Sequence, residues 1–259
     1  MDFLNRPRRS RSPGYVHGIG ANVAETLEAY ARGIIRGKHP IDSDQSEAVL
    51  RALNNWGWDD SLKLYLPFDE TSGQSAFDLS GNANTGTATG TTVVSGVFGK
   101  ARSFDGEDDE VDVGTDSSLT VTDISFSLEV WLKTTSSAEV VVFSKDSSHY
   151  CCLTATHLDV RADTHKSGTV AVNDDIWHYA TYVIDRLGDT ISLFVDGILD
   201  VSASYGLGDW PTTQTYIGSR KGSLFFPGYL DEIRFYSRIL TADEIYLHYL
   251  AGALKLGLI

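Results

Sequence analysis

Short stretches of alternating apolar and polar residues constrain the fold of this chain most strongly. In residues 126–133, FSLEVWLK, every second residue from Phe126 to Leu132 is apolar, and Ser127 and Glu129 stand between them. Residues two apart share a face of a β-strand, so this stretch predicts a strand with one strongly buried face. Similar stretches predict further strands at 62–68, 140–144, 177–185, 191–195, 214–218 and 228–236.

Turns rich in Gly, Asn, Asp and Ser separate these strands, and no internal repeat is visible. The composition, with 24 Gly, 12 Tyr, 11 Phe and a single Met, suits strands and turns better than a helical bundle. We therefore predict an all-β fold, a two-sheet antiparallel sandwich over residues 61–252. The apolar C-terminal tail at 253–259 either docks on a neighbouring chain or packs back on the sandwich, and the sequence leaves both open.

Residues 1–20 mix Arg, Ser, Pro and Gly without periodicity, which predicts a flexible basic arm. Its positive residues are Arg6, Arg8, Arg9 and Arg11. Residues 1–40 hold seven Lys or Arg against three Asp or Glu, so the net charge of −14 divides into +4 there and −18 in the remainder. We expect the arm to bind an acidic surface, and the acidic remainder argues against nucleic acid as a partner.

Residues 21–60 are predicted to form a helical hairpin. An apolar stripe on the first helix consists of Val23, Leu27, Tyr30 and Ile34. Gly37 ends this helix, and a second helix is expected at 43–55 with a polar cap before it. The hairpin is interpreted as a lid on the sandwich, an assembly handle or the remnant of a linker, and the sequence does not decide among these.

The sequence contains no run of about 18 apolar residues, which excludes a transmembrane helix. No apolar segment follows the arginines near Met1 as it would in a secretory signal. We therefore expect export by lysis or another non-classical route. The two cysteines, Cys151 and Cys152, are adjacent, so a disulfide framework is absent and both are predicted to be packed thiols.

Four segments in order along about 190 residues carry a resemblance to a known family. They read LPFDETSGQSAFDLSGNANTG at 66–86, GVFGKARSFDGEDDEVDVG at 96–114, DIWHYATYVIDRLGDTISLFVDG at 175–197 and FPGYLDEIRFYSRILTADEIYLHYLAG at 226–252. The chain resembles the concanavalin A-like lectin/glucanase superfamily, in its laminin G and pentraxin-like branch. The resemblance implies a jelly-roll sandwich of two curved antiparallel sheets. Within the last segment, Thr241 with an acid at Glu244 fits a helix cap.

Glu110 and Asp112 decide whether the resemblance extends to hydrolysis. In the glucanase-type hydrolases of this superfamily the catalytic strand looks like Glu-x-Asp-x-x-Glu, whereas here Glu110-Val111-Asp112-Val113 is followed by Gly114 and Thr115. The final Glu is missing, and a retaining mechanism needs two carboxyl groups about 5–5.5 Å apart in defined roles. The chain also lacks a G-x-S-x-G nucleophile elbow. We predict a protein that is not an enzyme.

Calcium is the cofactor that the resemblance implies, because oxygen ligands from loops suit this ion. The candidate ligands by resemblance are Glu70, Asp78 and Asp231. The turn chemistry of residues 78–82, DLSGN, is the alternative explanation for Asp78. The acidic run at 105–110 is expected to be a solvated turn, and the histidines lack the spacing of a zinc site.

Aromatic residues in or near the predicted loops are candidates for stacking on sugar rings. The residues predicted to contact a ligand are Trp210, Tyr216 and Phe225, with Trp210 foremost because it lies in the loop GLGDWPTT. Packing inside the sandwich is the alternative explanation for each of them.

Two classes of function remain after hydrolysis is set aside. The first is a virion or surface-assembly subunit, of the decoration, capsid-associated or fibre type, which displays a lectin-like sandwich anchored by residues 1–60. Its partners are other protein chains, and a homo-oligomer is expected. The alternative is a free-standing extracellular module for glycan binding or adhesion. We favour the first, because a fold usually found outside cells stands on a chain without a signal peptide.

Overall fold

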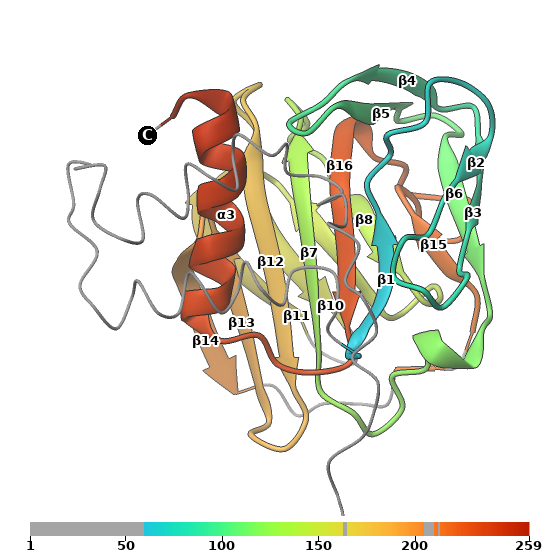
Figure 1. The fold of residues 1–259 in the computed structure, drawn as a ribbon. Helices are drawn as coiled ribbons and strands as arrows, with labels where there is room; N and C mark the ends of the chain where they lie inside the picture. The colour runs from blue at the N-terminus through green and yellow to red at the C-terminus, as the bar shows by residue number, and fades with distance from the viewer. Residues whose placement is uncertain (1–59, 163–164, 205–209, 212, 259) are drawn as a thin grey trace, which may run out of the picture.

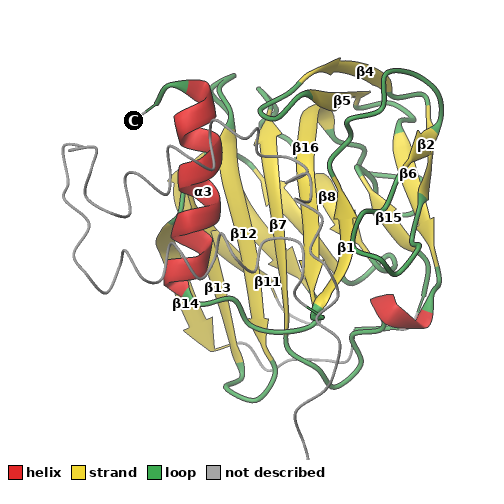
Figure 2. Cartoon of the chain, viewed as in Figure 1, coloured by secondary structure: helices red, strands yellow, loops and turns green. Residues whose placement is uncertain are grey.

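The structure, a computed structural model, describes residues 60–162, 165–204, 210–211 and 213–258. These residues form two antiparallel sheets packed face to face, with one α-helix lying against the outside of one sheet (Figure 1) (Figure 2). The two-sheet sandwich predicted from the sequence is therefore confirmed. The predicted arm at 1–20 and nearly all of the predicted hairpin at 21–60 lie outside the described residues.

Sheet A contains eight strands. Seven of them follow the order β14 (Ile198–Ser204), β13 (Thr190–Val195), β12 (His178–Asp185), β7 (Phe126–Lys133), β16 (Pro227–Tyr236), β5 (Lys100–Asp105) and β4 (Thr92–Ser95). The eighth, β1 (Leu62–Leu66), pairs with the second half of β16, while β5 pairs with its first half. The change of partner falls at Glu232, whose φ of +55° marks a local irregularity of β16.

Sheet B also contains eight strands. Their order is β11 (His165–Ala171), β10 (His157–Arg161), β9 (Tyr150–Thr154), β8 (Val140–Ser144), β15 (Thr215–Ile217), β6 (Glu110–Gly114), β3 (Gly86–Thr89) and β2 (Ser75–Ala76). A short 3₁₀ helix, η1 (Ser117–Leu119), follows β6. Each of the seven predicted strands is present, with bounds that differ by no more than two residues. Nine strands were not among those predictions: β2 to β6, β9 to β11 and β14.

The inner faces of the two sheets form one hydrophobic core. The apolar face predicted for 126–133 lies in it, because Phe126, Leu128, Val130 and Leu132 are all fully buried there. Both cysteines are buried free thiols, as predicted, and burial raises the pKa of each. The sandwich thus has the single contiguous core expected of one domain.

Helix α3 (Ala242–Leu256) begins with the predicted cap. The Thr241 hydroxyl accepts a hydrogen bond from the Glu244 amide, and the Glu244 carboxylate accepts one from the Thr241 amide. The helix ends at Gly257, which adopts a left-handed φ of +70°. The boundary predicted at residue 252 falls inside this helix, and Ala253 of the predicted tail is fully buried. No helix of the described residues is long and apolar enough to cross a membrane.

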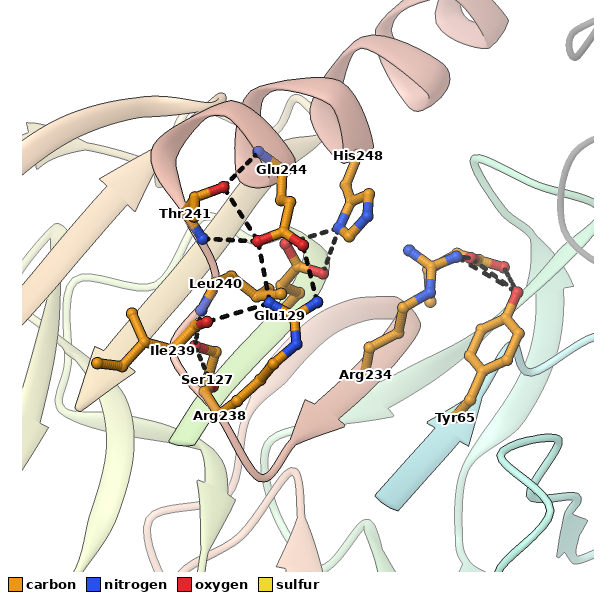
Figure 3. A network of polar contacts seen from close by, with 11 residues as sticks. Tyr65, Ser127, Glu129, Arg234, Arg238, Ile239, Leu240, Thr241, Glu244 and His248 are labelled. Carbon is orange, nitrogen blue, oxygen red and sulfur yellow. Dashed lines mark hydrogen bonds and ion pairs between the residues drawn. The ribbon is translucent and has the colours of Figure 1, made fainter. Parts of the chain in front are cut away.

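Strand β7 is buried on both faces, whereas the sequence predicted one buried face. Trp131 stacks on Tyr249 of α3 with ring centroids 5.9 Å apart. Nδ1 of His248, also on α3, lies 2.9 Å from the Glu129 carboxylate (Figure 3). The helix therefore covers the face of β7 that its alternation marks as polar.

Candidate functional site

The outer face of sheet B gathers polar and aromatic side chains from several strands. In β6, Val111 and Val113 point into the core, so Glu110 and Asp112 point outward. The same alternation directs Tyr216 of β15 outward, opposite Asp112 in the strand register. These three outward-facing side chains are half-buried, which leaves part of each accessible to a ligand.

The acidic end of this face, defined by Glu110, Asp112 and Tyr216, is held by neighbouring polar groups. Glu110 Oε2 accepts a hydrogen bond from the Ser219 hydroxyl at 2.6 Å. Asp112 accepts hydrogen bonds from the Gly114 amide at 2.9 Å and from the Gln214 side chain. Partial burial and the two nearby carboxylates raise the pKa of Tyr216, so its phenol stays protonated and able to donate. The arrangement offers both hydrogen-bond acceptors and an aromatic ring.

A second group of side chains, the Tyr150 cluster, lies on the same face around β9 and β10. The Tyr150 hydroxyl donates to Glu139 Oε1 at 2.8 Å, and Arg161 donates to Glu139 Oε2 at 3.3 Å. The guanidinium of Arg220 lies 5.6 Å from the centre of the Tyr150 ring. These residues carry no signal in the sequence, because 150–161 contains no long alternating stretch and Arg220 lies in a loop.

The three residues predicted to contact a ligand differ in burial and position. Trp210 is fully buried, and its ring packs edge-on against Phe126 with centroids 4.9 Å apart, which argues against a ligand contact through Trp210. Tyr216 lies on the outer face of sheet B. Phe225 is half-buried, beside Phe226, which belongs to the core.

The three predicted calcium ligands do not gather in one place. Among the described residues, the ligand atoms of Asp105, Asp108 and Asp109 form the only group of three His, Cys or acidic side chains within 4.8 Å of one another. Glu70 accepts a hydrogen bond from the Phe77 amide at 2.7 Å and lies 3.6 Å from Arg102. Asp78 accepts from the amides of Tyr65, Ser80 and Asn84, which matches the alternative explanation of a turn.

Asp231 is the predicted calcium ligand whose surroundings fit a cation. It is fully buried, and its Oδ2 accepts hydrogen bonds from the amides of Val97 and Phe98 at 2.8 and 3.2 Å. Its Oδ1 is buried without a hydrogen-bond partner in the structure. Burial, together with the like charges of Glu232 and Asp69, raises the pKa of Asp231.

A backbone turn closes on the same carboxylate. A Cβ atom at Gly96 would lie 2.5 Å from Asp231 Oδ2 and 2.6 Å from the carbonyl oxygen of Lys100, so this approach requires glycine. Asp69 Oδ1 accepts a hydrogen bond from the Lys100 amide at 2.8 Å. Two carboxylates and a carbonyl oxygen are the hard donors that Ca²⁺ prefers. Asp69 was not predicted as a ligand, although it is adjacent to Glu70.

The acidic run at 105–110 behaves as a turn. The Asp105 carboxylate accepts hydrogen bonds from the amides of Glu107 and Asp108, and Asp109 accepts one from the Asp105 amide. These bonds are those of a turn, as expected, although Asp109 is buried and therefore not solvated.

Comparison with known proteins places the fold in a family. A family model described as the concanavalin A-like lectin/glucanases superfamily matches residues 105–246, more than half of the chain, and the chain belongs to that superfamily. No curated protein matches the chain in sequence.

Solved structures of binding domains resemble this chain in fold. The binding domain of Paraclostridial Mosquitocidal Protein 1 aligns with a TM-score of 0.62 and 18% identity, over 73% of this chain and 52% of that chain. Domain 4 of AbnA, a GH43 extracellular arabinanase from Geobacillus stearothermophilus in complex with arabinotriose, aligns with a TM-score of 0.60 and 20% identity, over 72% of this chain and 97% of that chain. The botulinum neurotoxin serotype D binding domain aligns with a TM-score of 0.59 and 15% identity, over 75% and 52%.

This chain spans about half the length of the first and third of these structures. Identities this low establish the shared fold alone. The chain therefore belongs to the concanavalin A-like lectin/glucanases superfamily and shares the fold of these binding domains.

Proposed function

We propose that this protein is a non-enzymatic module that binds a glycan on the outer face of sheet B. The observation that carries the proposal is the outward-facing set of Glu110, Asp112 and Tyr216, half-buried and held in place by hydrogen bonds. Carboxylate acceptors suit the hydroxyl groups of a sugar, and an aromatic ring suits its apolar face. Domain 4 of AbnA, which shares the fold, was solved with arabinotriose and supports this ligand class by analogy.

Glycan-array screening followed by calorimetry tests the proposal. We expect Tyr216→Ala and Asp112→Asn each to weaken binding of the best glycan at least about tenfold, because each removes a direct contact. Lys255→Gln, on the exposed side of α3 next to sheet A, is the matched control and should bind as the wild type does. An array without any binder, or binding indifferent to both variants, would contradict the proposal.

We further propose that calcium is held by Asp231 with Asp69 and the Lys100 carbonyl oxygen. The supporting observation is the buried, unpartnered Oδ1 of Asp231 beside a second carboxylate. When bound, the ion would supply a positive charge to the unpartnered Oδ1 of Asp231, joining β16 to the turn at 96–99. Calcium in hundredfold excess over its Kd is expected to stabilise the fold by about 2.7 kcal/mol.

Thermal unfolding with calcium or with EDTA tests this site. The wild type should melt at a higher temperature in calcium, whereas Asp231→Asn should show no difference between the two conditions. Asp109→Asn, in the acidic turn, is the matched control and should keep the calcium response. An equal response in Asp231→Asn would place the ion elsewhere.

The role of the module in a larger assembly is a second proposal. A virion or surface-assembly subunit, with the sandwich displayed and residues 1–60 as the anchor, is favoured by the arginine-rich sequence of residues 1–20. Light scattering of the full chain and of a chain lacking residues 1–60 tests it. A defined oligomer that is lost with those residues supports an assembly subunit, and a monomer in both cases favours a free-standing extracellular module.

A further inference from the structure

Arg220 is placed on the outer face of sheet B by a rigid turn. The Arg220 amide donates to the Ser223 carbonyl at 2.7 Å, and the Ser223 hydroxyl donates to the Arg220 carbonyl at 2.8 Å. The same segment runs beside β8, since the Leu224 carbonyl accepts a hydrogen bond from the Val141 amide at 2.9 Å. The turn therefore lies alongside the strands, next to the Tyr150 cluster.

The guanidinium of Arg220 is held in a fixed position. It lies 5.6 Å from the centre of the Tyr150 ring, within the range of a cation–π contact, and its Nε is 3.3 Å from the Ser223 hydroxyl. Tyr150 is itself fixed through its hydrogen bond to Glu139. A side chain held in this way loses little conformational freedom when it binds an anion.

The acids around Arg220 are already engaged. Glu139 uses one carboxylate oxygen for Tyr150 and the other for Arg161. Asp159 is fully buried and contacts Ser167 and Arg161. Within the described part of the chain Arg220 has no ion-pair partner, and the next residue in the turn, Lys221, is exposed. A fixed cation without a counter-charge is unusual in a protein with a net charge of −14.

We propose that Arg220 binds an anionic group of the glycan, so that the ligand is an acidic polysaccharide carrying carboxylate or sulfate groups. This inference rests on the proposed function. The planar guanidinium matches a carboxylate or a sulfate through two parallel hydrogen bonds. The Tyr150 cluster therefore favours a negatively charged group of the ligand. The end of the face formed by Glu110 and Asp112 does not.

The two ends of the face lie close enough to serve one chain of sugars. Ser219 donates to Glu110 at the acidic end, and the adjacent Arg220 lies over Tyr150. The ligand therefore carries its anionic group next to a sugar whose hydroxyl groups face Glu110 and Asp112. An anionic group of the ligand placed beside Glu110 and Asp112 would be repelled by their carboxylates. This repulsion fixes the direction in which the ligand lies on the sheet.

Calorimetry with three probes tests this inference on the full chain: a hyaluronan tetrasaccharide, in which carboxylated and neutral sugars alternate, a κ-carrageenan tetrasaccharide, in which sulfated and neutral sugars alternate, and arabinotriose as the neutral probe. We expect the wild type to bind at least one acidic probe at least about tenfold more tightly than arabinotriose. Arg220→Gln should abolish that preference. Arg220→Lys should keep part of it, because the positive charge remains but the two parallel hydrogen bonds of the guanidinium are lost. Lys255→Gln, which removes one positive charge on the other sheet, should change nothing.

The outcomes separate this inference from the proposed function. Equal affinity for acidic and neutral probes, or full preference in Arg220→Gln, overturns the inference and leaves glycan binding intact. Failure to bind any probe or any glycan on the array overturns both. Thermal unfolding of each variant shows whether the fold is retained, and the milder Arg220→Lys serves if Arg220→Gln is unfolded. The acidic probe bound more tightly identifies the group as carboxylate or sulfate.

Discussion

The outer faces of the two sheets differ in how deeply they bury their charges. On sheet A, Glu129 and Arg234 are 0% and 2% exposed. Arg234 is paired there with Glu232 and stacked 4.7 Å from the centre of the Tyr65 ring (Figure 3). On sheet B, Glu110, Asp112 and Tyr216 remain half-buried. Both faces are polar in sequence, and helix α3 lies against the first. The buried charges therefore serve the fold, and the accessible ones are available to a ligand.

Removing a charge from the buried face is expected to have the largest effect. Arg234→Met leaves Glu232 buried without its partner, which typically costs about 3–5 kcal/mol. Glu139→Gln on sheet B is the matched control, because Glu139 is partly exposed in its ion pair with Arg161, which keeps Asp159 as a partner, and should cost at most about 1 kcal/mol. Urea unfolding measures both variants. Equal losses would show that the two faces do not differ in this way.

Lys145 and Asp159 are exceptions on the sheet B side because both are buried. Lys145 offers a further test of the comparison. Its amine is buried at the end of β8, where it donates to the Leu119 carbonyl and the Thr215 hydroxyl at 3.0 and 2.8 Å. Burial lowers its pKa from 10.5 to about 8. Between these values the unfolded chain binds more protons than the folded chain, so stability rises with pH in that window.

The expected rise due to Lys145 is about 3 kcal/mol at most between pH 8 and pH 10.5. Denaturant unfolding across this window, for the wild type and Lys145→Met, isolates it, because the other titrating groups cancel in the difference. Curves that run parallel would mean that Lys145 titrates at its ordinary pKa in the folded chain.

His178, at the edge of β12 in sheet A, should give a smaller effect of the opposite sign. Its ring nitrogens lie 2.9 Å from Asp196 and 3.0 Å from Asp174. Burial lowers the pKa of His178, but these two carboxylates outweigh burial and raise it overall. The stabilisation is therefore complete below the unfolded pKa of about 6.5 and disappears as pH rises through the raised folded value.

Urea unfolding between pH 5.5 and pH 8.5 should show that His178→Gln loses more stability at the acidic end than at the alkaline end. His157→Gln on sheet B is the matched control, since His157 is half-buried and its ring nitrogens contact the neutral Thr156 hydroxyl. A constant loss across the pH range would indicate a packing role instead of a charged one.

The smallest effect on stability is expected at the proposed ligand face. Asp112→Asn keeps the size of the side chain and its place in the strand, so the free energy of unfolding should change by no more than about 0.5 kcal/mol. Glycan binding should nevertheless weaken. A large loss of stability at Asp112 would assign this carboxylate to the fold and not to a ligand.

Local patterns predicted the fold well because they depend on nearest neighbours. The alternation in 126–133 gave the core face of β7, and Thr241 with Glu244 gave the start of α3. The missed strands β9 and β10 are buried on both faces over most of their length, so alternation is weak there. For the proposed site, Tyr216 was predicted from its type and place. Trp210 was also predicted but lies in the core, and Tyr150, which was not predicted, lies on the outer face.

Sequence by itself determined seven of the strands, their core-facing residues and the cap of α3, since each follows from residues close together in the chain. Tertiary structure alone decided which polar residues became buried. Glu129 lies under His248, 119 positions away, and Arg220 reaches Tyr150 only because the turn at 220–223 lies beside β8. Solvent exposure and ion pairing depend on which distant segments meet, and no local pattern of residues records that.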